Sequence, residues 1–476
     1  MPTGLPLVEA FVPLLALVGL LLAALQLFGD GMIGGPVQLA LILAGCVAGA
    51  VGVRRGVSWR DLERAVAANL ARAALPILIL LAIGSLIGVW MAAGIIPALI
   101  VYGGEILHPG IFYLAALLIC ALVALVVGSS WTTAGTVGVA LIGIAAASGL
   151  PLPMTAGAII SGVYFGDKLS PLSDTTNLAS ALAETELFTH VRYLLWTTVP
   201  ALLVAVVFFA FASLMAGESA DTSGLAVMTA ALNDNFRLSA WLLLPFIAMF
   251  ALAWLGVPAL VTILGSVVLG GVIGTAVQAG DGGVAALKLY WSVAANGYSA
   301  TTGHAPADEL LSRGGMESML GTVWLIIAAM FFSGMMERSG CLARLLGAVL
   351  GLFRRDRSIL FGVGGTAMLS NVVTSDQYVS LVIASRMYAD EVQRRGLAPE
   401  TLSRTSEDFG TVTSPLVPWN TCGAFMAATL GVATWAYLPF CIFNLASPVI
   451  SALYIATGFG IRHAAPADAA PAATAA

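Results

Sequence analysis

The sequence predicts an all-α polytopic membrane protein made of two inverted-topology repeats, each with about five spans, a helical hairpin and a broken helix. Three observations predict this fold class. The chain of 476 residues is 59% hydrophobic and only 9% charged. Several uncharged runs reach the roughly 18 residues that a membrane-spanning helix needs. The chain also repeats itself, with loops of opposite charge character. The apolar runs are continuous, whereas a β-barrel requires short alternating strands.

Four apolar runs are the clearest spans: Ala10–Phe28, Gly110–Val127, Tyr193–Met215 and Trp435–Thr457. The first run has no preceding Lys or Arg and is long for a signal-peptide core, so we expect a retained helix. The predicted organisation is a first transmembrane repeat over residues 1–216, an extracytoplasmic connector over 217–237, a second, inverted repeat over 238–460, and a disordered tail over 461–476. The tail is rich in Ala and Pro, a composition typical of disorder.

The repeat is visible in three matched stretches. "LIGVWMAAGIIP" from Leu86 corresponds to "FFSGMMERSGCL" from Phe331, with two glycines of each in register. At the same offset "GSSWTT" falls on "TSDQYV", so Asp376 corresponds to Ser130. Further on, "GDKLSPLSDTTN" lies over "GTVTSPLVPWNT" in a slightly slipped register, and both contain Ser-Pro-Leu.

Charges in equivalent loops predict that the second repeat is turned over. Arginines cluster before the third helix, whereas the following loop, "GIIPALIVYGGEILHPG", has no Lys or Arg. The counterpart of that loop, Cys341–Arg357, carries four arginines. Since positive residues favour the cytoplasm, we expect equivalent loops on opposite sides of the membrane. We expect the protein to lie in the cell (inner) membrane of a bacterium, with both termini in the cytoplasm. "GSS" joins Gly110–Val127 to Trp131–Ala147 as a hairpin, whose twin is expected at Ser358–Asp390.

The two Ser-Pro-Leu stretches predict broken membrane helices, because proline interrupts helix hydrogen bonding. Irregular backbone survives in a membrane only within protein or beside a water-filled cavity. Small hard cations prefer oxygen ligands, and both breaks are rich in carboxylates, hydroxyls and amides. A buried carboxylate can hold a proton or a cation, and that competition is the basis of cation/proton exchange. Inverted repeats with broken helices are the signature of secondary transporters.

The breaks and hairpin tips supply the candidate ion- or substrate-binding residues, which are Ser130, Thr133, Asp167, Ser170, Asp174, Thr175, Asn177, Ser375, Asp376, Asp408, Ser414, Asn420 and Thr421. Intramembrane ionisable residues are functional candidates by default, and Asp174 and Asp376 are the expected Na⁺ ligands. The alternative for Asp167, Lys168 and Asp408 is a structural role at the break. Glu407 is expected to form an interfacial ion pair with Arg404. Lys168 discriminates between substrates: free in a cavity it would hold a substrate carboxylate, and paired with Asp167 or Asp174 it would leave the site to cations.

The chain resembles the NhaC-type sodium/proton antiporter family of the ion-transporter superfamily. The residues that carry the resemblance are "GSSWTTAGTVG", "GDKLSPLSDTTNLA", "GYSATTG" with "LLSRGG", and "EDFGTVTSPLVPWNTCGAFMAATLGV". The resemblance runs from about Leu75 to Leu453. It implies sodium/proton exchange on a scaffold of inverted repeats with hairpins, although relatives exchange organic acids or amino acids with cations. Phe409 is bulky where a small residue is expected.

The sequence therefore predicts a secondary active transporter, and not an enzyme, that exchanges Na⁺ for H⁺ by alternating access. The alternative is a Na⁺- or H⁺-coupled exchanger of small carboxylates or amino acids; a channel or structural protein would have no use for matched broken helices. No cofactor is expected, and without a P-loop direct drive by ATP is not expected either. The expected partners are Na⁺, H⁺ and the lipid bilayer, with no nucleic acid and with a homodimer as one oligomeric option.

Overall fold

The computed structural model describes residues 5–28, 35–219, 222–278, 284–301, 308, 311–312, 314–352 and 358–463. These residues form helices and connecting loops, apart from one isolated β-bridge between Leu397 and His463. The helices of the first half are α1 (Leu7–Phe28), α2 (Pro36–Arg54), α3 (Trp59–Ala92), α4 (Ile95–Ile106), α5 (Phe112–Val127), α6 (Ser130–Thr133), α7 (Val139–Ala147), α8 (Leu152–Leu169), α9 (Asp174–Leu182) and α10 (Leu187–Ser219). Helix α11 (Thr222–Asn235) occupies the expected connector.

The second half is also helical throughout its described residues. It contains α12 (Leu244–Trp254), α13 (Ala259–Gln278), α14 (Val284–Asn296), α16 (Leu320–Arg338), α17 (Cys341–Leu352), α18 (Ser358–Val373), α19 (Gln377–Arg394), α20 (Pro399–Phe409), α21 (Thr421–Leu430), α22 (Thr434–Tyr437) and α23 (Ile442–Thr457). In the described part of the chain, eight helices are long and apolar enough to cross a membrane, or up to ten if each of two bent pairs counts as one span. The chain is thus an all-helical polytopic membrane protein, as predicted.

One predicted span is wrong. Trp435–Thr457 is not a single helix, because α22 passes into a 3₁₀ turn at Leu438–Phe440 and α23 starts afresh at Ile442. Pro439 lies within that turn and lacks the N–H that a continuous helix would need. The helical stretch α22 to Phe440 is instead bent by 89° against α21.

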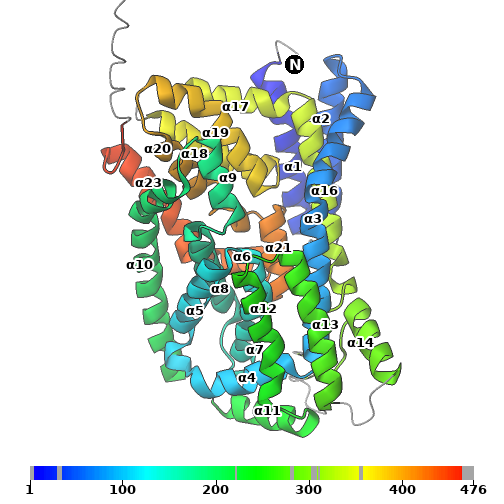
Figure 1. The fold of residues 1–476 in the computed structure, drawn as a ribbon. Helices are drawn as coiled ribbons and strands as arrows, with labels where there is room; N and C mark the ends of the chain where they lie inside the picture. Colours follow the sequence, from blue (N-terminus) through cyan, green and yellow to red (C-terminus); the bar gives the residue numbers. More distant parts are fainter. Residues whose placement is uncertain are drawn as a thin grey trace, which may run out of the picture.

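Both expected hairpins are present, and they enter the molecule from opposite ends (Figure 1). Helices α5 and α7 rise from the lower end in the view of Figure 1, and α18 and α19 descend from the upper end, so that their tips lie at mid-height. Gly128 makes the first turn with φ 71°, a left-handed conformation that glycine adopts without strain. At the second tip the left-handed residue is Ser375, with φ 58°.

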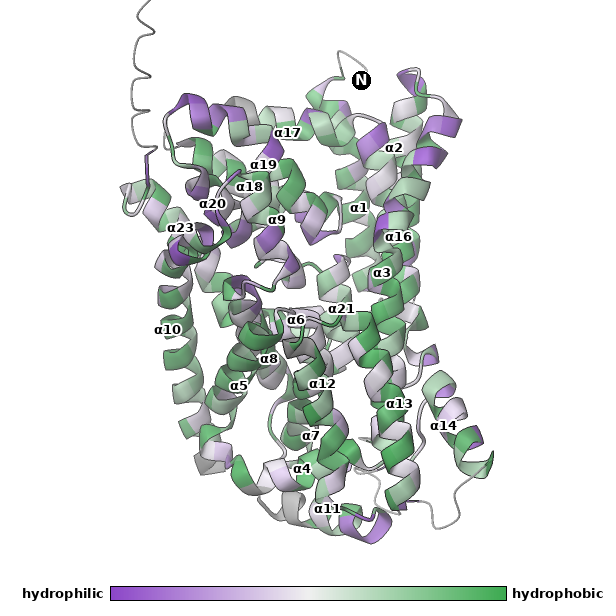
Figure 2. Cartoon of the chain, in the orientation of Figure 1, coloured by the Kyte–Doolittle hydropathy of each residue, from purple (hydrophilic) through white to green (hydrophobic). Residues whose placement is uncertain are grey.

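Helices α4 and α17, which lie within the two loops compared by charge in the sequence, also lie at opposite ends of the molecule. Helix α4 lies at the lower end and α17 at the upper end, next to the N-terminus and the last described residues of the chain (Figure 1). Figure 2 shows hydrophilic residues gathered at the upper end, and among α18, α19 and α20 in the interior, while α5, α10 and α13 are mostly apolar. This placement is what the charge pattern predicts, and the inverted relation of the halves as a whole stays a prediction.

Two broken helices run between the hairpins. The first consists of α8 and α9 with the break at residues 170–173, and the second of α20 and α21 with the break at residues 410–420. Gly162 and Gly166 let α8 approach α5 closely, because a Cβ on Gly166 would lie 2.2 Å from the Ala121 carbonyl oxygen. Small residues four apart are a common means of close helix packing in membranes.

The end of the chain departs slightly from the predicted tail. Ala398 donates its N–H to the Arg462 carbonyl oxygen at 3.0 Å, and His463 pairs with Leu397. Residues 461–463 therefore belong to the fold, and residues 464–476 lie outside the described residues.

Candidate ion-binding site

The first hairpin tip is bound to the first broken helix through Asp167. This residue lies in the last turn of α8, just before the break, and is 6% exposed. Its Oδ2 accepts the backbone N–H of Ser130 at 3.0 Å, at the start of α6. One carboxylate thus joins the tip to the break, and the hydroxyls of Ser130 and Ser173 lie beside it.

The second hairpin tip is bound to the second broken helix in a related way. Thr421, the first residue of α21, donates its N–H to the Ser375 carbonyl oxygen at 2.9 Å and its hydroxyl to Asp376 Oδ2 at 3.4 Å. Asp376 is 8% exposed and caps α19, since its Oδ1 accepts the N–H groups of Tyr378 and Val379. The second hairpin tip therefore lies against the second break.

Ser375 combines two features that are unusual for a structural serine. Its backbone is left-handed, with φ 58°, a conformation that costs a non-glycine residue energy and is concentrated at functional sites. Its hydroxyl is buried and has no hydrogen-bond partner among the described residues. Since buried polar groups are nearly always partnered, this oxygen is available for a ligand.

The two tip-to-break contacts differ in which segment, the hairpin tip or the break, supplies the carboxylate. In the first half the acid, Asp167, comes from the break, and in the second half the acid, Asp376, comes from the tip. The hydroxyl of Tyr378 lies within electrostatic range of both, and of Asp174 as well. The two contacts are therefore neighbours around α19 and carry negative charge from both halves of the chain.

The halves are also in direct contact at the breaks. The Ser414 hydroxyl lies 3.2 Å from Gln377 Oε1 and 3.4 Å from the Tyr164 hydroxyl of α8. The rings of Trp131, in α6, and Phe425, in α21, stack with centroids 4.1 Å apart and planes 13° apart. The second break is thus in contact with α8, and α21 is in contact with the first hairpin tip.

Lys168 is fully buried and is not free. Its Nζ forms an ion pair with Asp408 and donates to Ser447 Oγ at 3.1 Å. The same carboxylate oxygen, Oδ1, accepts the hydroxyl of Thr197 at 3.0 Å. Neither Asp167 nor Asp174 is the partner of this lysine, and its pairing with Asp408 agrees with the alternative of a structural role at the break.

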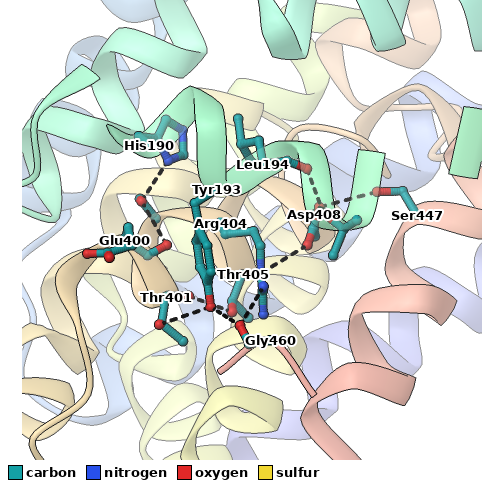
Figure 3. Close-up of polar contacts among 12 residues, drawn as sticks. His190, Tyr193, Leu194, Glu400, Thr401, Arg404, Thr405, Asp408, Ser447 and Gly460 are labelled. Carbon is teal, nitrogen blue, oxygen red and sulfur yellow. Dashed lines mark hydrogen bonds and ion pairs between the residues drawn. The ribbon is translucent and has the colours of Figure 1, made fainter. Parts of the chain in front are cut away.

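Arg404 extends this charged cluster beyond Asp408 (Figure 3). The fully buried guanidinium lies over the Tyr193 ring, 4.3 Å from its centroid, and donates from Nη1 to the Gly460 carbonyl oxygen at 3.2 Å. Its Nε lies 3.9 Å from Asp408 Oδ2. Asp408 therefore sits between two buried cations and is unsuited to bind a third.

The expected ion pair between Glu407 and Arg404 is wrong. Glu407 is fully buried, not interfacial, and neither of its carboxylate oxygens has a hydrogen-bond partner among the described residues. The side chain of Arg404, at position i−3, is used by Tyr193, Gly460 and Asp408. An uncompensated buried carboxyl is energetically expensive, which makes Glu407 a functional candidate that the sequence did not single out.

Other candidate residues fall into two groups. Asp174 and Asn177 are exposed, and the Asn177 amide donates to the carbonyl oxygens of Pro171 and Ser173 at 2.8 Å, which fixes the loop of the break. The remaining buried candidates bond to nearby groups: Thr133 to Ser129 O, Ser170 to Leu172 N, Thr175 to Ser173 Oγ, Ser414 to Thr411 O, and Asn420 to Cys422 N. Asp174 as a Na⁺ ligand stays a prediction, and the buried carboxylates at the tips are Asp167 and Asp376.

Four side chains at the site were missed, namely Tyr164, Gln377, Tyr378 and Glu407. Gln377 and Tyr378 follow Asp376 directly, and the run of polar residues that continues from Asp376 into Gln377 was the available signal. Among the described residues, no group of three or more His, Cys, Asp and Glu side chains is placed to hold a metal ion. The oxygens at the tips are instead a mixture of carboxylates, hydroxyls and backbone carbonyls.

Comparison with known proteins gives a consistent result. The model of the Na⁺/H⁺ antiporter family matches residues 162–459. The chain is 37% identical over 428 residues to the Na⁺/H⁺ antiporter NhaC of Alkalihalophilus pseudofirmus, with 89% of this chain and 91% of the relative covered. It is 36% identical over 424 residues to the malate-2H⁺/Na⁺-lactate antiporter of Bacillus subtilis, with 89% and 90% covered. It is 35% identical over 414 residues to the arginine/ornithine antiporter ArcD of Halobacterium salinarum, with 85% and 83% covered. The chain belongs to the Na⁺/H⁺ antiporter family.

Proposed function

We propose that this protein exchanges Na⁺ for H⁺ across a bacterial cell membrane, and that the ions bind where the hairpin tips contact the broken helices. The observation that carries the proposal is the pair of tip-to-break contacts, each built around one buried aspartate, Asp167 or Asp376. Both carboxylates lie beside backbone that is not helical, which is where secondary transporters bind ions.

The oxygens at these contacts suit Na⁺. Asp376 Oδ2 and the unpartnered Ser375 hydroxyl supply a carboxylate and a neutral oxygen at the second tip, and Asp167 supplies another carboxylate at the first. Hard cations prefer such ligands. When Na⁺ leaves, a buried carboxylate is left without its cation and favours protonation of the acids at the site, so departure of Na⁺ is linked to uptake of a proton.

Alternating access is the mechanism we propose for the exchange. The hairpins enter from opposite ends (Figure 1), so each tip separates the site from one side of the membrane. The contact between Ser414 and Tyr164 links the two broken helices, and the contact between Trp131 and Phe425 links the first hairpin tip to the second broken helix. By the positive-inside rule we assign the arginine-rich upper end, which carries both chain ends, to the cytoplasm.

The second candidate function is exchange of small carboxylates or amino acids coupled to Na⁺ or H⁺. The names of two relatives, the malate-2H⁺/Na⁺-lactate antiporter and the arginine/ornithine antiporter, favour it. The placement of Lys168 does not, because its ammonium is held by Asp408 and Ser447 and is not free for a substrate carboxylate.

Transport by the purified protein in proteoliposomes separates the two functions. With a pH-sensitive dye inside, an imposed Na⁺ gradient is expected to move protons in the absence of any organic substrate. Malate, lactate, arginine and ornithine, each added on its own and then with Na⁺, are expected to change the rate by less than about twofold. Proton movement that needs one of the organic compounds would overturn the first function and establish the second.

A further inference from the structure

Glu407 is a buried acid that the tip-to-break contacts do not use. It lies in the last turn of α20 with no exposed surface, and both its oxygens lack a hydrogen-bond partner in the described part of the chain. Charges of Lys168, Asp167 and Asp408 act on it, and Thr175 of α9 is close. A carboxylate in such a place would be unpaired and dehydrated, so the neutral acid is the stable form in this conformation.

The charges around Glu407 leave room for one more negative charge. Lys168 and Arg404 are buried cations, and Asp408 is the one anion between them. With Glu407 protonated the cluster has one excess positive charge, and with Glu407 ionised it is neutral. Among the described residues, three further atoms of the cluster have no hydrogen-bond partner, namely Arg404 Nε, Arg404 Nη2 and Asp408 Oδ2. The cluster can thus stabilise an ionised Glu407 after a small rearrangement.

The helices around α20 contribute few other charges. The neighbouring helix α8 carries Tyr164, Asp167 and Lys168, and α9 carries Asp174. Helix α10 carries His190, Arg192, Tyr193 and Glu218, and α18 carries no titratable side chain. Helix α19 carries Tyr378, Arg386, Tyr388, Asp390, Glu391 and Arg394, and α23 carries Tyr454. Of these, Lys168 and Asp167 act on Glu407, while His190 acts on Lys168 and Asp408 and is bonded through Nδ1 to Ser403 at 2.7 Å.

We propose that Glu407 is a dedicated proton-binding site of the exchanger, separate from the Na⁺ contacts and coupled to them through the charge of Asp167. The inference rests on the proposed function. While Asp167 is an unoccupied anion, its negative charge favours the proton on Glu407. Na⁺ bound at Asp167 cancels that charge, the O–H bond of Glu407 breaks with its electron pair left on the oxygen, and the proton passes to water. Departure of Na⁺ reverses the step, and one proton is taken up again.

Because the proposed proton site is separate from the Na⁺ contacts, a change at Glu407 is expected to affect proton movement and not Na⁺ binding. Glu407→Gln keeps a neutral, isosteric side chain that resembles the protonated acid and cannot ionise. Sodium exchange against sodium needs no proton and is expected to stay within about twofold of wild type. Na⁺-driven proton movement is expected to fall at least about tenfold.

The test measures proton release when Na⁺ binds, in purified protein in detergent, by calorimetry in buffers with different enthalpies of ionisation. The expected result is one proton fewer released per Na⁺ bound by Glu407→Gln than by wild type. Glu400→Gln is the matched control, because Glu400 lies in the same helix and pairs with Arg462 at 3.5 Å near the surface. It is expected to release as many protons as wild type.

Other outcomes overturn the inference in distinguishable ways. Wild-type protein that binds Na⁺ without releasing protons would refute the proposed function together with this site. If wild type releases protons and Glu407→Gln releases the same number per Na⁺ bound, the site alone is refuted. Loss of sodium–sodium exchange in a folded Glu407→Gln variant would also refute the site alone. If Glu407→Gln does not fold, Glu407→Asp decides: it should retain proton release with a shifted pH profile, and an unchanged profile would overturn the assignment.

Discussion

At the scale of single residues, Lys168 and Asp408 show how a charge inside a membrane protein is stabilised. They belong to different halves of the chain, 240 residues apart, and both are completely removed from solvent. Thr197 and Ser447 complete the hydrogen bonding of the shared carboxylate oxygen. A buried pair contributes little net stability, whereas removal of one partner leaves an uncompensated charge.

The first prediction follows from this asymmetry. Lys168→Met and Asp408→Asn, taken singly, are expected to destabilise the protein by about 3–5 kcal/mol, which is typical when one partner of a buried pair is removed. The double variant is expected to recover most of the loss, since neither charge remains. Thermal unfolding of the four proteins in detergent measures the effect, and losses that simply add would show that the pair is not coupled.

The second prediction concerns Asp376, which both caps α19 and faces Thr421. Asn is as good a helix cap as Asp, so Asp376→Asn should preserve the hairpin and remove only the charge. Loss of one charged ligand is expected to weaken apparent Na⁺ affinity by about 10- to 100-fold and to shift the pH dependence of transport. Asp376→Glu should have a smaller effect. Unchanged affinity and pH profile in correctly inserted Asp376→Asn would make Asp376 a structural cap.

At the scale of elements, the close packing of α5 and α8 fixes the first tip-to-break contact. A Cβ on Gly166 would lie 2.2 Å from the Ala121 carbonyl oxygen and 2.5 Å from the Leu125 nitrogen. Both contacts are with backbone, which cannot move as a side chain can. The position of Asp167, the next residue, therefore depends on this glycine.

The third prediction is that Gly166→Ala lowers the free energy of unfolding by about 1–3 kcal/mol, as overpacking of a tight interior does, and reduces Na⁺ affinity through displacement of Asp167. Gly19→Ala in α1 is the matched control, because nothing lies within 4 Å of a Cβ built there. It should unfold at the wild-type temperature. Equal melting temperatures for the two variants would contradict the close contact.

Elements could be predicted from sequence to the extent that local chemistry determines them. Apolar runs gave the spans, and "GSS" and the Ser-Pro-Leu stretches gave the hairpins and breaks. The apolar run at Trp435–Thr457 misled because composition does not show that Pro439 ends a helical segment in this context. The partner of Lys168 and the burial of Glu407 depend on how helices that are distant in the sequence pack together. A single sequence does not contain that information.

At the scale of the whole molecule, the opposed hairpins require a defined orientation in the bilayer. The fourth prediction is that cysteines placed at Glu105, at the end of α4, and at Arg355, which lies outside the described residues and between α17 and α18 in the sequence, label from opposite sides of the membrane. Helices α4 and α17 lie at opposite ends of the molecule (Figure 1). Each cysteine is introduced into a cysteine-free variant, and its labelling by a membrane-impermeant maleimide added on one side is measured. Labelling of both positions from one side would contradict the inverted repeats.

The central claim is that H⁺ and Na⁺ exchange through the contacts of Asp167 and Asp376, and uphill sodium transport tests it most directly. Proteoliposomes that are acidic inside receive radioactive Na⁺ outside, with no organic substrate present. Wild-type protein is predicted to accumulate Na⁺ above the external concentration until a protonophore is added, and Asp167→Asn and Asp376→Asn are predicted to accumulate none. Absence of uphill uptake by wild type, or undiminished uptake by both variants, would contradict the account.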